Sequence, residues 1–170
     1  MACTALVAPA LAALLAAAPG PAAPPPAAPT LSVEQVIEGA PPHLTTLTLD
    51  QARQLPGVLR ETTRSGPSEW KPGSTAEFRT VVLQGLALTF VIHPGERPFL
   101  VGATYTAPSW VLPGGLAVGA RGELVRRLLG PGGREGAKLR YVSAIGAPGI
   151  VEITLKGDVV AEITLVPYSS

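Results

Sequence analysis

Alternating apolar and polar positions run from about residue 77 to the end of the chain, with one long interruption. The stretch EFRTVVLQGLALTFVIH is rich in β-branched and aromatic residues, and a Gln-Gly pair divides it into two strands. The stretch FLVGATYT follows a proline-bounded turn and places alternate apolar side chains on one face. These patterns predict three consecutive strands.

The interruption, GLAVGARGELVRRLLGPGG at positions 115–133, has the period of a helix. Its large apolar residues recur at i, i+1, i+4 and i+5, which gives one narrow face: Leu124, Val125, Leu128 and Leu129. Gly130 suits the position after a helix, where a positive φ is favoured, and Pro131 stops the helix. The pattern predicts one amphipathic helix over about 120–129, with its glycines as punctuation.

Three more strands are expected after this helix, in KLRYVS and in the hairpin IVEITLKGDVVAEITLV. A three-residue loop at 156–158 keeps the large apolar side chains of the hairpin on one face. That register sets Glu152 opposite Glu162, and Arg140 on the preceding strand could relieve their repulsion. The fold class predicted is α+β, an antiparallel sheet of about six strands with one main helix, in the order βββ-α-βββ.

Shorter elements are expected before these strands. Ser32 with Gln35, and Thr48 with Gln51, have the spacing of capping boxes and predict two short helices. The segment 60–74 is polar and rich in turn residues, so it is interpreted as a surface loop around Trp70.

The N-terminal segment has the plan of an export signal. An apolar run at 4–18 is too short to span a bilayer, and it ends in small residues that fit an A-x-A cleavage site. The expected organisation is a signal peptide at 1–18 (or to 23), an Ala/Pro-rich tether at 19–30 and a single α+β domain at 31–170. The predicted location is the periplasm or outside the cell, with no transmembrane span in the mature chain.

Composition removes several function classes. The formal net charge is +1, which argues against nucleic acid as a partner. The single cysteine, Cys3, lies in the leader, so the mature domain would have no disulfide, no thiol nucleophile and no cysteine metal ligand.

The glycine-rich stretch does not match a phosphate-binding loop. A Walker loop ends in Gly-Lys-Ser/Thr, which is missing here, and Gly115, Gly119 and Gly122 do not have dinucleotide-binding spacing. The G-x-x-G at 119–122 lacks the two flanking helices of an RNA clamp. No cofactor is therefore expected.

Catalytic and metal-binding patterns are weak. His43 and His93 lie beside prolines, and neither has a sequence neighbour at a metal or triad spacing. No G-x-S-x-G elbow is present. Glu152 and Glu162 could mimic a glycosidase pair, but strand alternation makes them two outward side chains. No catalytic residue and no metal ligand is assigned.

The stretch from Gly115 to Val166 resembles small exported bacterial envelope proteins, namely outer-membrane-assembly lipoproteins of the SmpA type and β-lactamase-inhibitor-like modules. The matching positions are Gly119, Val125, Leu129 and Gly130, followed by strands. The resemblance implies a periplasmic protein-interaction module without catalysis.

These observations predict an exported envelope protein that binds another envelope protein. The residues expected to contact the partner are Trp110, Arg121, Arg126 and Arg127. Two other functions stay open. One is a hydrolase with an unrecognised carboxylate or histidine site, and the other is a structural envelope protein without a discrete ligand. A deep polar cleft would favour an enzyme, whereas a flat sheet face with exposed aromatic residues would favour a binding protein.

Overall fold

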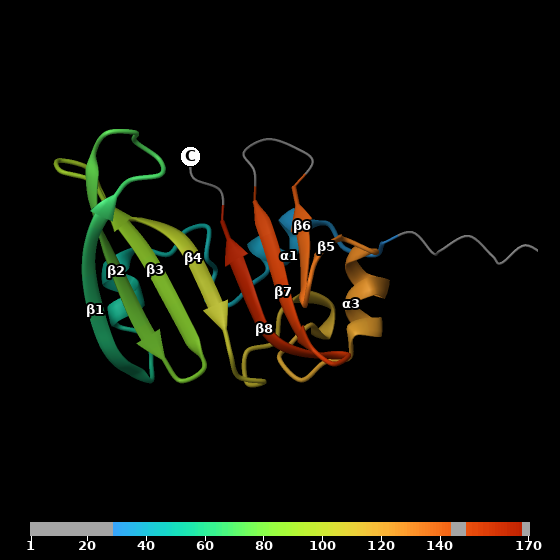
Figure 1. The fold of residues 1–170 in the computed structure, drawn as a ribbon. Coiled ribbons are helices and arrows are strands. Elements are labelled where there is room, and N and C mark those ends of the chain that lie inside the picture. Colours follow the sequence, from blue (N-terminus) through green and yellow to red (C-terminus); the bar gives the residue numbers. More distant parts are fainter. Residues whose placement is uncertain (1–28, 144–148, 168–170) are drawn as a thin grey trace, which may run out of the picture.

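The computed structural model describes residues 29–143 and 149–167 of the chain, and these form one antiparallel sheet with short helices packed on it (Figure 1). The strand order is β1-β2-β3-β4-β8-β7-β6-β5. The strands are β1 (Val58–Pro67), β2 (Thr75–Leu83), β3 (Leu86–Ile92), β4 (Phe99–Tyr105), β5 (Gly133–Glu135), β6 (Lys138–Val142), β7 (Ile150–Lys156) and β8 (Val159–Val166). The helices are α1 (Val33–Glu38), α2 (Leu49–Arg53), the 3₁₀ turn η1 (Pro113–Gly115) and α3 (Gly122–Leu129).

The sheet consists of two four-stranded meanders, β1–β4 and β5–β8. They join where their last strands pair, with Ala103 opposite Leu165 and Tyr105 opposite Ile163. Helical segments precede each meander, α1 and α2 before the first and η1 and α3 before the second. The expected signal peptide at 1–18 and most of the expected tether at 19–30 lie outside the described residues.

The prediction of about six strands in the order βββ-α-βββ, with one main helix, is wrong. The described residues form a protein that is mostly sheet, with eight strands and only short helices. The helix expected at about 120–129 is the eight-residue α3, one of several small elements. The extra strands are β1 and β5, one at each edge of the sheet.

The sequence predicts a surface loop at 60–74, but residues 60–67 belong to β1, which has no apolar face to signal a strand. Eight of its ten residues are exposed, so its side chains do not alternate between core and solvent. Its pairing with β2 makes it a strand, and this pairing runs from Val58 to Pro67 with one irregularity near its start. Backbone pairing of this kind leaves no periodic signal in the sequence.

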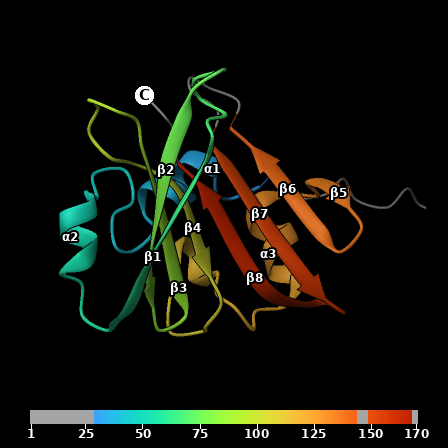
Figure 2. The same cartoon turned by 60° about the vertical axis from the view of Figure 1, so that its left-hand side comes forward.

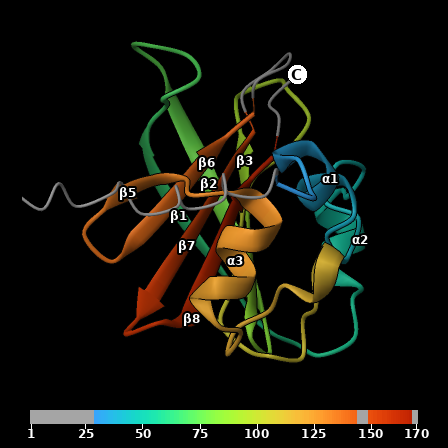
Figure 3. The same cartoon turned by 90° about the vertical axis from the view of Figure 1, so that its right-hand side faces the viewer.

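The main core lies between the sheet and the helices, which cover one face only (Figure 3). Alternation along the strands supplies the sheet side of this core, as predicted for the regular strands. The fully buried large side chains include Val81, Leu88, Phe90, Tyr105, Ile153, Ile163 and Leu165 from the strands, and Val36 and Ile37 from α1. We call this side of the sheet the helix face and the other side the open face.

Both predicted capping boxes are present. Ser32 and Gln35 bond reciprocally at the start of α1, and Thr48 and Gln51 do so at the start of α2. Each box satisfies two backbone amides that a helix start leaves without a partner. The caps fix where these short helices begin, and burial of one apolar side holds them on the sheet.

The helix α3 follows its predicted period. Val125, Leu128 and Leu129 are buried, and Gly130 ends the helix with a φ of 82°. Arg126 and Arg127 lie in the last turn, where positive charge suits the helix dipole. Arg126, Arg127 and Gly130 therefore suit the C-terminal end of this helix.

The terminal hairpin has a different register from the one expected. Lys156 pairs with Val159, so the turn has two residues, and a register shift between Thr154 and Leu155 absorbs the extra residue of β8. The shift keeps the apolar side chains on one face, with Ile153 opposite Ile163. Glu152 consequently faces Thr164 and not Glu162, and it lies 3.5 Å from Arg140, as Nε to Oε1.

Candidate functional site

The open face of the sheet carries threonines, small apolar residues and a few charged side chains. Directly paired residues point to the same side of a sheet, so the register defines rows across this face. One row crosses the whole sheet and consists of Arg60, Val82, Ala87, Thr104, Thr164, Glu152, Arg140 and Gly133. A second row contains Thr62, Thr80, Thr89 and Gly102. Among the described elements, no helix packs over this face (Figures 2 and 3).

Threonine pairs stiffen the middle of the open face. The hydroxyl oxygens of Thr80 and Thr89 lie 3.1 Å apart, and those of Thr104 and Thr164 lie 3.4 Å apart. β-branched side chains have few rotamers, so they lose little entropy when another surface covers them. The face thus offers a pre-ordered surface with short side chains.

Aromatic residues gather at one corner of the open face, and we call Trp70, Phe78 and Phe99 the aromatic corner. The rings of Trp70 and Phe99 meet edge to face at 6.0 Å, and those of Trp70 and Phe78 are 6.3 Å apart. The Arg64 guanidinium lies 4.1 Å above the Phe78 ring, which places it for a cation–π contact. Trp70 stays 37% exposed, so the corner presents an aromatic surface to solvent.

A buried serine–histidine pair lies beside the aromatic corner. Ser68 Oγ is 2.7 Å from His93 Nε2, and both side chains are buried. Nδ1 of His93 is 3.2 Å from Oε2 of Glu96 but is not aligned for a hydrogen bond. Lys71 bonds the other oxygen of Glu96 at 2.9 Å. The hydrogen bond from Lys71 is the main reason that the pKa of Glu96 is lowered.

This Ser68–His93–Glu96 cluster has the residue types of a serine-hydrolase triad, with the histidine between the serine and the carboxylate. Sequence spacing did not reveal it. Its hydrogen bonds suit a structural role better. Ser68 Oγ also accepts the backbone N–H groups of Trp70 and Lys71, at 3.2 and 3.0 Å. Both of its lone pairs are then engaged, which leaves its hydrogen for His93 and weakens it as a nucleophile. The cluster joins the β1–β2 loop to the β3–β4 loop.

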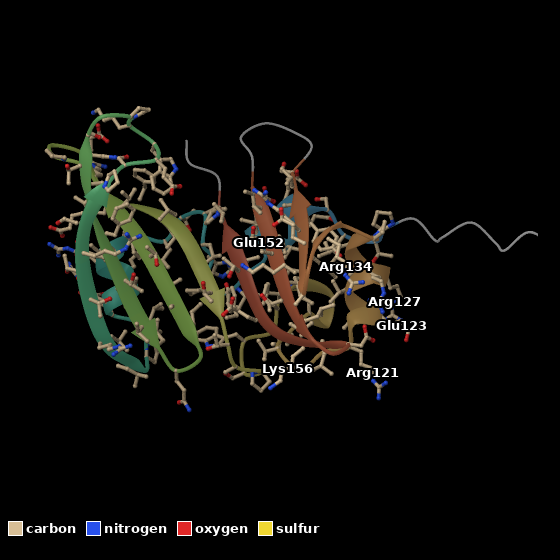
Figure 4. All side chains as sticks on the ribbon, viewed as in Figure 1. Arg121, Glu123, Arg127, Arg134, Glu152 and Lys156 are labelled. Carbon is tan, nitrogen blue, oxygen red and sulfur yellow. The ribbon has the colours of Figure 1, made fainter. Side chains whose placement is uncertain are left out.

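The residues that the sequence predicted as partner contacts lie on the helix side of the sheet. Trp110 is half-buried, its Nε1 donates to the Gln84 carbonyl at 2.9 Å, and its ring lies 6.5 Å from Tyr105. Arg121 precedes α3, and Arg126 pairs with Asp158 at 3.1 Å. Figure 4 shows Arg121 and Arg127 at the margin of the molecule, pointing away from the sheet. No contact in the described part of the chain joins Trp110 to these arginines.

The amides of the glycine-rich stretch are occupied by the neighbouring strand. Gly119 N–H donates to the Val160 carbonyl and Gly122 N–H to the Asp158 carbonyl, both at 2.8 Å. Val160 N–H in turn donates to Ala120, at the same distance. A phosphate cradle needs free, converging N–H groups, and these groups face β8.

Two hollows are lined by residues near the helices and the edge of the second meander. One, of about 390 Å³, is lined by the start of α1 and by β6, and a hydrogen bond joins Glu34 to Ser143 at its margin. That bond from Ser143 is the main reason that the pKa of Glu34 is lowered. The other, of about 420 Å³, is lined by Trp110, Pro56 and Leu83. Neither lining contains a histidine.

Metal-binding clusters and membrane-spanning helices are absent from the described residues. Within residues 29–143 and 149–167, no group of three His, Cys, Asp or Glu side chains could hold a metal ion. The helices in these ranges are all too short or too polar to cross a bilayer. Comparison with protein-family models, with curated proteins and with solved structures found no match, so the resemblance of residues 115–166 to exported envelope proteins stays a sequence-based expectation.

Proposed function

We propose that this protein is a non-catalytic interaction module of the bacterial cell envelope that binds another envelope protein through the open face of its sheet. The main observation behind this proposal is that the helices pack on one face of the sheet and leave the other face without a covering layer. Among the described residues, the open face carries only a small second core cluster, Ala76, Phe78, Val91 and Val101, beside the aromatic corner. The rest of that face is not used for a core and is available for binding.

The character of the open face supports this proposal. It combines an exposed aromatic residue, Trp70, at one corner with rows of threonines and isolated charges, and aromatic and arginine side chains are enriched at protein interfaces. The export signal expected at the N-terminus supports an envelope location. Trp110, Arg121, Arg126 and Arg127 lie on other surfaces, and the open-face proposal does not use them as contacts.

Photo-crosslinking from defined positions tests the proposal. A photoreactive amino acid is placed at Thr104 or Thr164, in the middle of the open face, and at exposed Thr45 in the loop between α1 and α2. In envelope extract, a discrete crosslinked protein is expected from the first two positions and not from Thr45.

Competition then shows whether that contact is specific. Excess wild-type protein without the photoreactive amino acid should compete for the partner and remove the crosslink. Excess Thr45→Arg variant should do the same. The Thr164→Arg variant should not, because a long charged side chain would hold a partner away from the face. Crosslinks of equal strength from all three positions, or effective competition by Thr164→Arg, would argue against open-face binding.

A serine hydrolase is the second candidate, and the Ser68–His93–Glu96 cluster favours it. A fluorophosphonate probe labels activated serines covalently. Labelling of the full chain that is lost in Ser68→Ala and in His93→Gln would support the hydrolase. The occupied lone pairs of Ser68 lead us to expect no labelling.

A further inference from the structure

The edge strand β1 is long and regular. It has ten residues and pairs with β2 without interruption from Arg60 to Pro67. Its outer edge faces no other strand among the described residues, because β1 is the first strand in the sheet order (Figure 1). The opposite edge, β5, has only three residues. Natural sheets commonly protect their edges by shortness, bulges or charge, so β1 is the edge that needs an explanation.

The acidic residue of β1 is neutralised by neighbouring arginines, so it adds no net charge to this edge. Glu61 points to the helix face, where it accepts two hydrogen bonds from Arg53 on α2, at 2.9 and 2.8 Å. Arg79 lies 3.6 Å from the same carboxylate. The remaining charges of β1 are therefore positive.

These positive charges are Arg60 and Arg64, which share the open face with Thr62 between them. Both are exposed, and neither forms an ion pair with a carboxylate within the described ranges. Arg64 contacts the Phe78 ring, so its guanidinium is held at the border between β1 and the aromatic corner. The edge thus combines unpaired backbone groups with two unneutralised cations on one side.

A second copy of the chain fits this edge poorly. In an antiparallel pair around a two-fold axis, centring on residue 60, 61 or 64 places a charged residue opposite itself. Centring on residue 62 places Arg60 opposite Arg64. Like charges directly opposite one another are destabilising, so most central registers of a β1–β1 pair are disfavoured.

We propose that β1 accepts an extended acidic segment of the partner as an additional strand, with carboxylates opposite Arg60 and Arg64. Backbone hydrogen bonds would supply the attachment, and the two charge pairs would set the register. The acidic residues must be four positions apart, because alternate side chains of a strand share a face. This inference rests on the proposed function, for which it names the chemistry of the partner.

A short synthetic strand tests the inference without the natural partner. The probe is the peptide Thr-Glu-Thr-Val-Thr-Glu-Thr, which reads the same in both directions and puts its glutamates on one face. Binding to the full chain is measured by fluorescence anisotropy of the labelled peptide. We expect saturable binding that weakens at least tenfold when both glutamates become glutamine, and that weakens with added salt.

Matched variants locate the site. Arg60→Gln with Arg64→Gln should weaken binding at least tenfold. Arg121→Gln with Arg127→Gln removes the same charge beside α3 and should leave binding unchanged. The reverse result would place the acidic segment at α3 and overturn the proposal. So would equal binding of the scrambled peptide Thr-Thr-Glu-Glu-Thr-Val-Thr, whose glutamates lie on opposite faces.

Backbone pairing is tested separately on the wild-type chain. Two further peptides carry N-methyl groups on the odd or the even residues, and only one of these sets should abolish binding, because alternate amides of a strand face its neighbour. Hydrogen exchange should slow at alternate amides of β1 when the unmodified peptide is added. Unchanged exchange along β1 would overturn the proposal even if the arginine variants misfold. If the peptide does not bind β1, the crosslinking result for the open face still stands. Failure of this inference is therefore distinguishable from failure of the proposed function.

Discussion

Ser68 and His93, which are 25 positions apart in the sequence, meet at 2.7 Å and join the two loops at one end of the first meander. Ser68 also accepts two backbone amides of its own loop. One hydroxyl thus organises the turn that carries Trp70 and connects it to the β3–β4 loop.

Replacing Ser68 with alanine should destabilise the protein. The change leaves the buried His93 Nε2 and two amides without their partner, and an unsatisfied buried polar group costs about 1–3 kcal/mol. Urea unfolding followed by tryptophan fluorescence would measure the loss. Ser65→Ala, on the exposed part of β1, is the control and should change the free energy of unfolding by less than about 0.5 kcal/mol. Equal effects of the two changes would contradict a joining role for Ser68.

The acid stability of the protein should depend on Glu61. The hydrogen bonds from Arg53 lower the pKa of Glu61 below its ordinary value of 4.5. A carboxyl whose pKa is lower in the folded state stabilises that state above the unfolded pKa, and the contribution disappears as pH falls through the folded pKa. The stability difference between wild type and Glu61→Gln should therefore be constant from neutral pH to about 5 and shrink at lower pH. Urea unfolding across this range measures it, and a difference that grows on acidification would refute the assignment.

Alkaline stability should depend on Tyr105. Burial raises the pKa of this tyrosine, and its hydroxyl donates to the Pro41 carbonyl at 2.7 Å. A raised folded-state pKa gives stability that is present below the unfolded pKa and is lost as pH rises above it, near 10.

Tyr105→Phe should cost about 1 kcal/mol near neutral pH through the lost hydrogen bond, and the cost should shrink above pH 10 as the wild type weakens. Thermal unfolding at several pH values compares the two proteins. A stability difference between the two proteins that widens above pH 10 would contradict the raised folded-state pKa of Tyr105.

Two glycines with similar backbone angles should respond differently to alanine. Gly85 has a φ of 75° and Gly57 a φ of 83°. A Cβ on Gly85 would lie 2.1 Å from the Ala107 Cβ, whereas one on Gly57 would have nothing within 4 Å. Gly57→Ala should cost about 1–2 kcal/mol for the left-handed conformation alone, and Gly85→Ala should cost more because the chain must also shift. Chemical denaturation compares the free energies of unfolding of the two variants. An equal loss in both would mean that the β2–β3 turn accommodates the added Cβ without further destabilisation.

The candidate site was only partly accessible from the sequence. Trp70 and Trp110 were visible as aromatic residues in irregular segments, but which face each one joins depends on strand pairing far along the chain. The His93 side chain has no partner at a recognisable sequence spacing, because Ser68 reaches it across the end of the sheet. The open face itself is a property of which side the helices cover, and strand alternation does not choose that side.

Local patterns in the sequence determined the elements that carry their own signal. Alternation specifies β2, β3 and β4, capping boxes start α1 and α2, and Gly130 ends α3, since each depends on residues within one or two turns or pleats. Tertiary structure alone decided that residues 58–67 form the edge strand β1, that a register shift lets Ile153 face Ile163, and that Ser68 meets His93. These features depend on a partner strand or loop that supplies backbone hydrogen bonds across long sequence separations, and such pairing imposes no period on the residues that accept it.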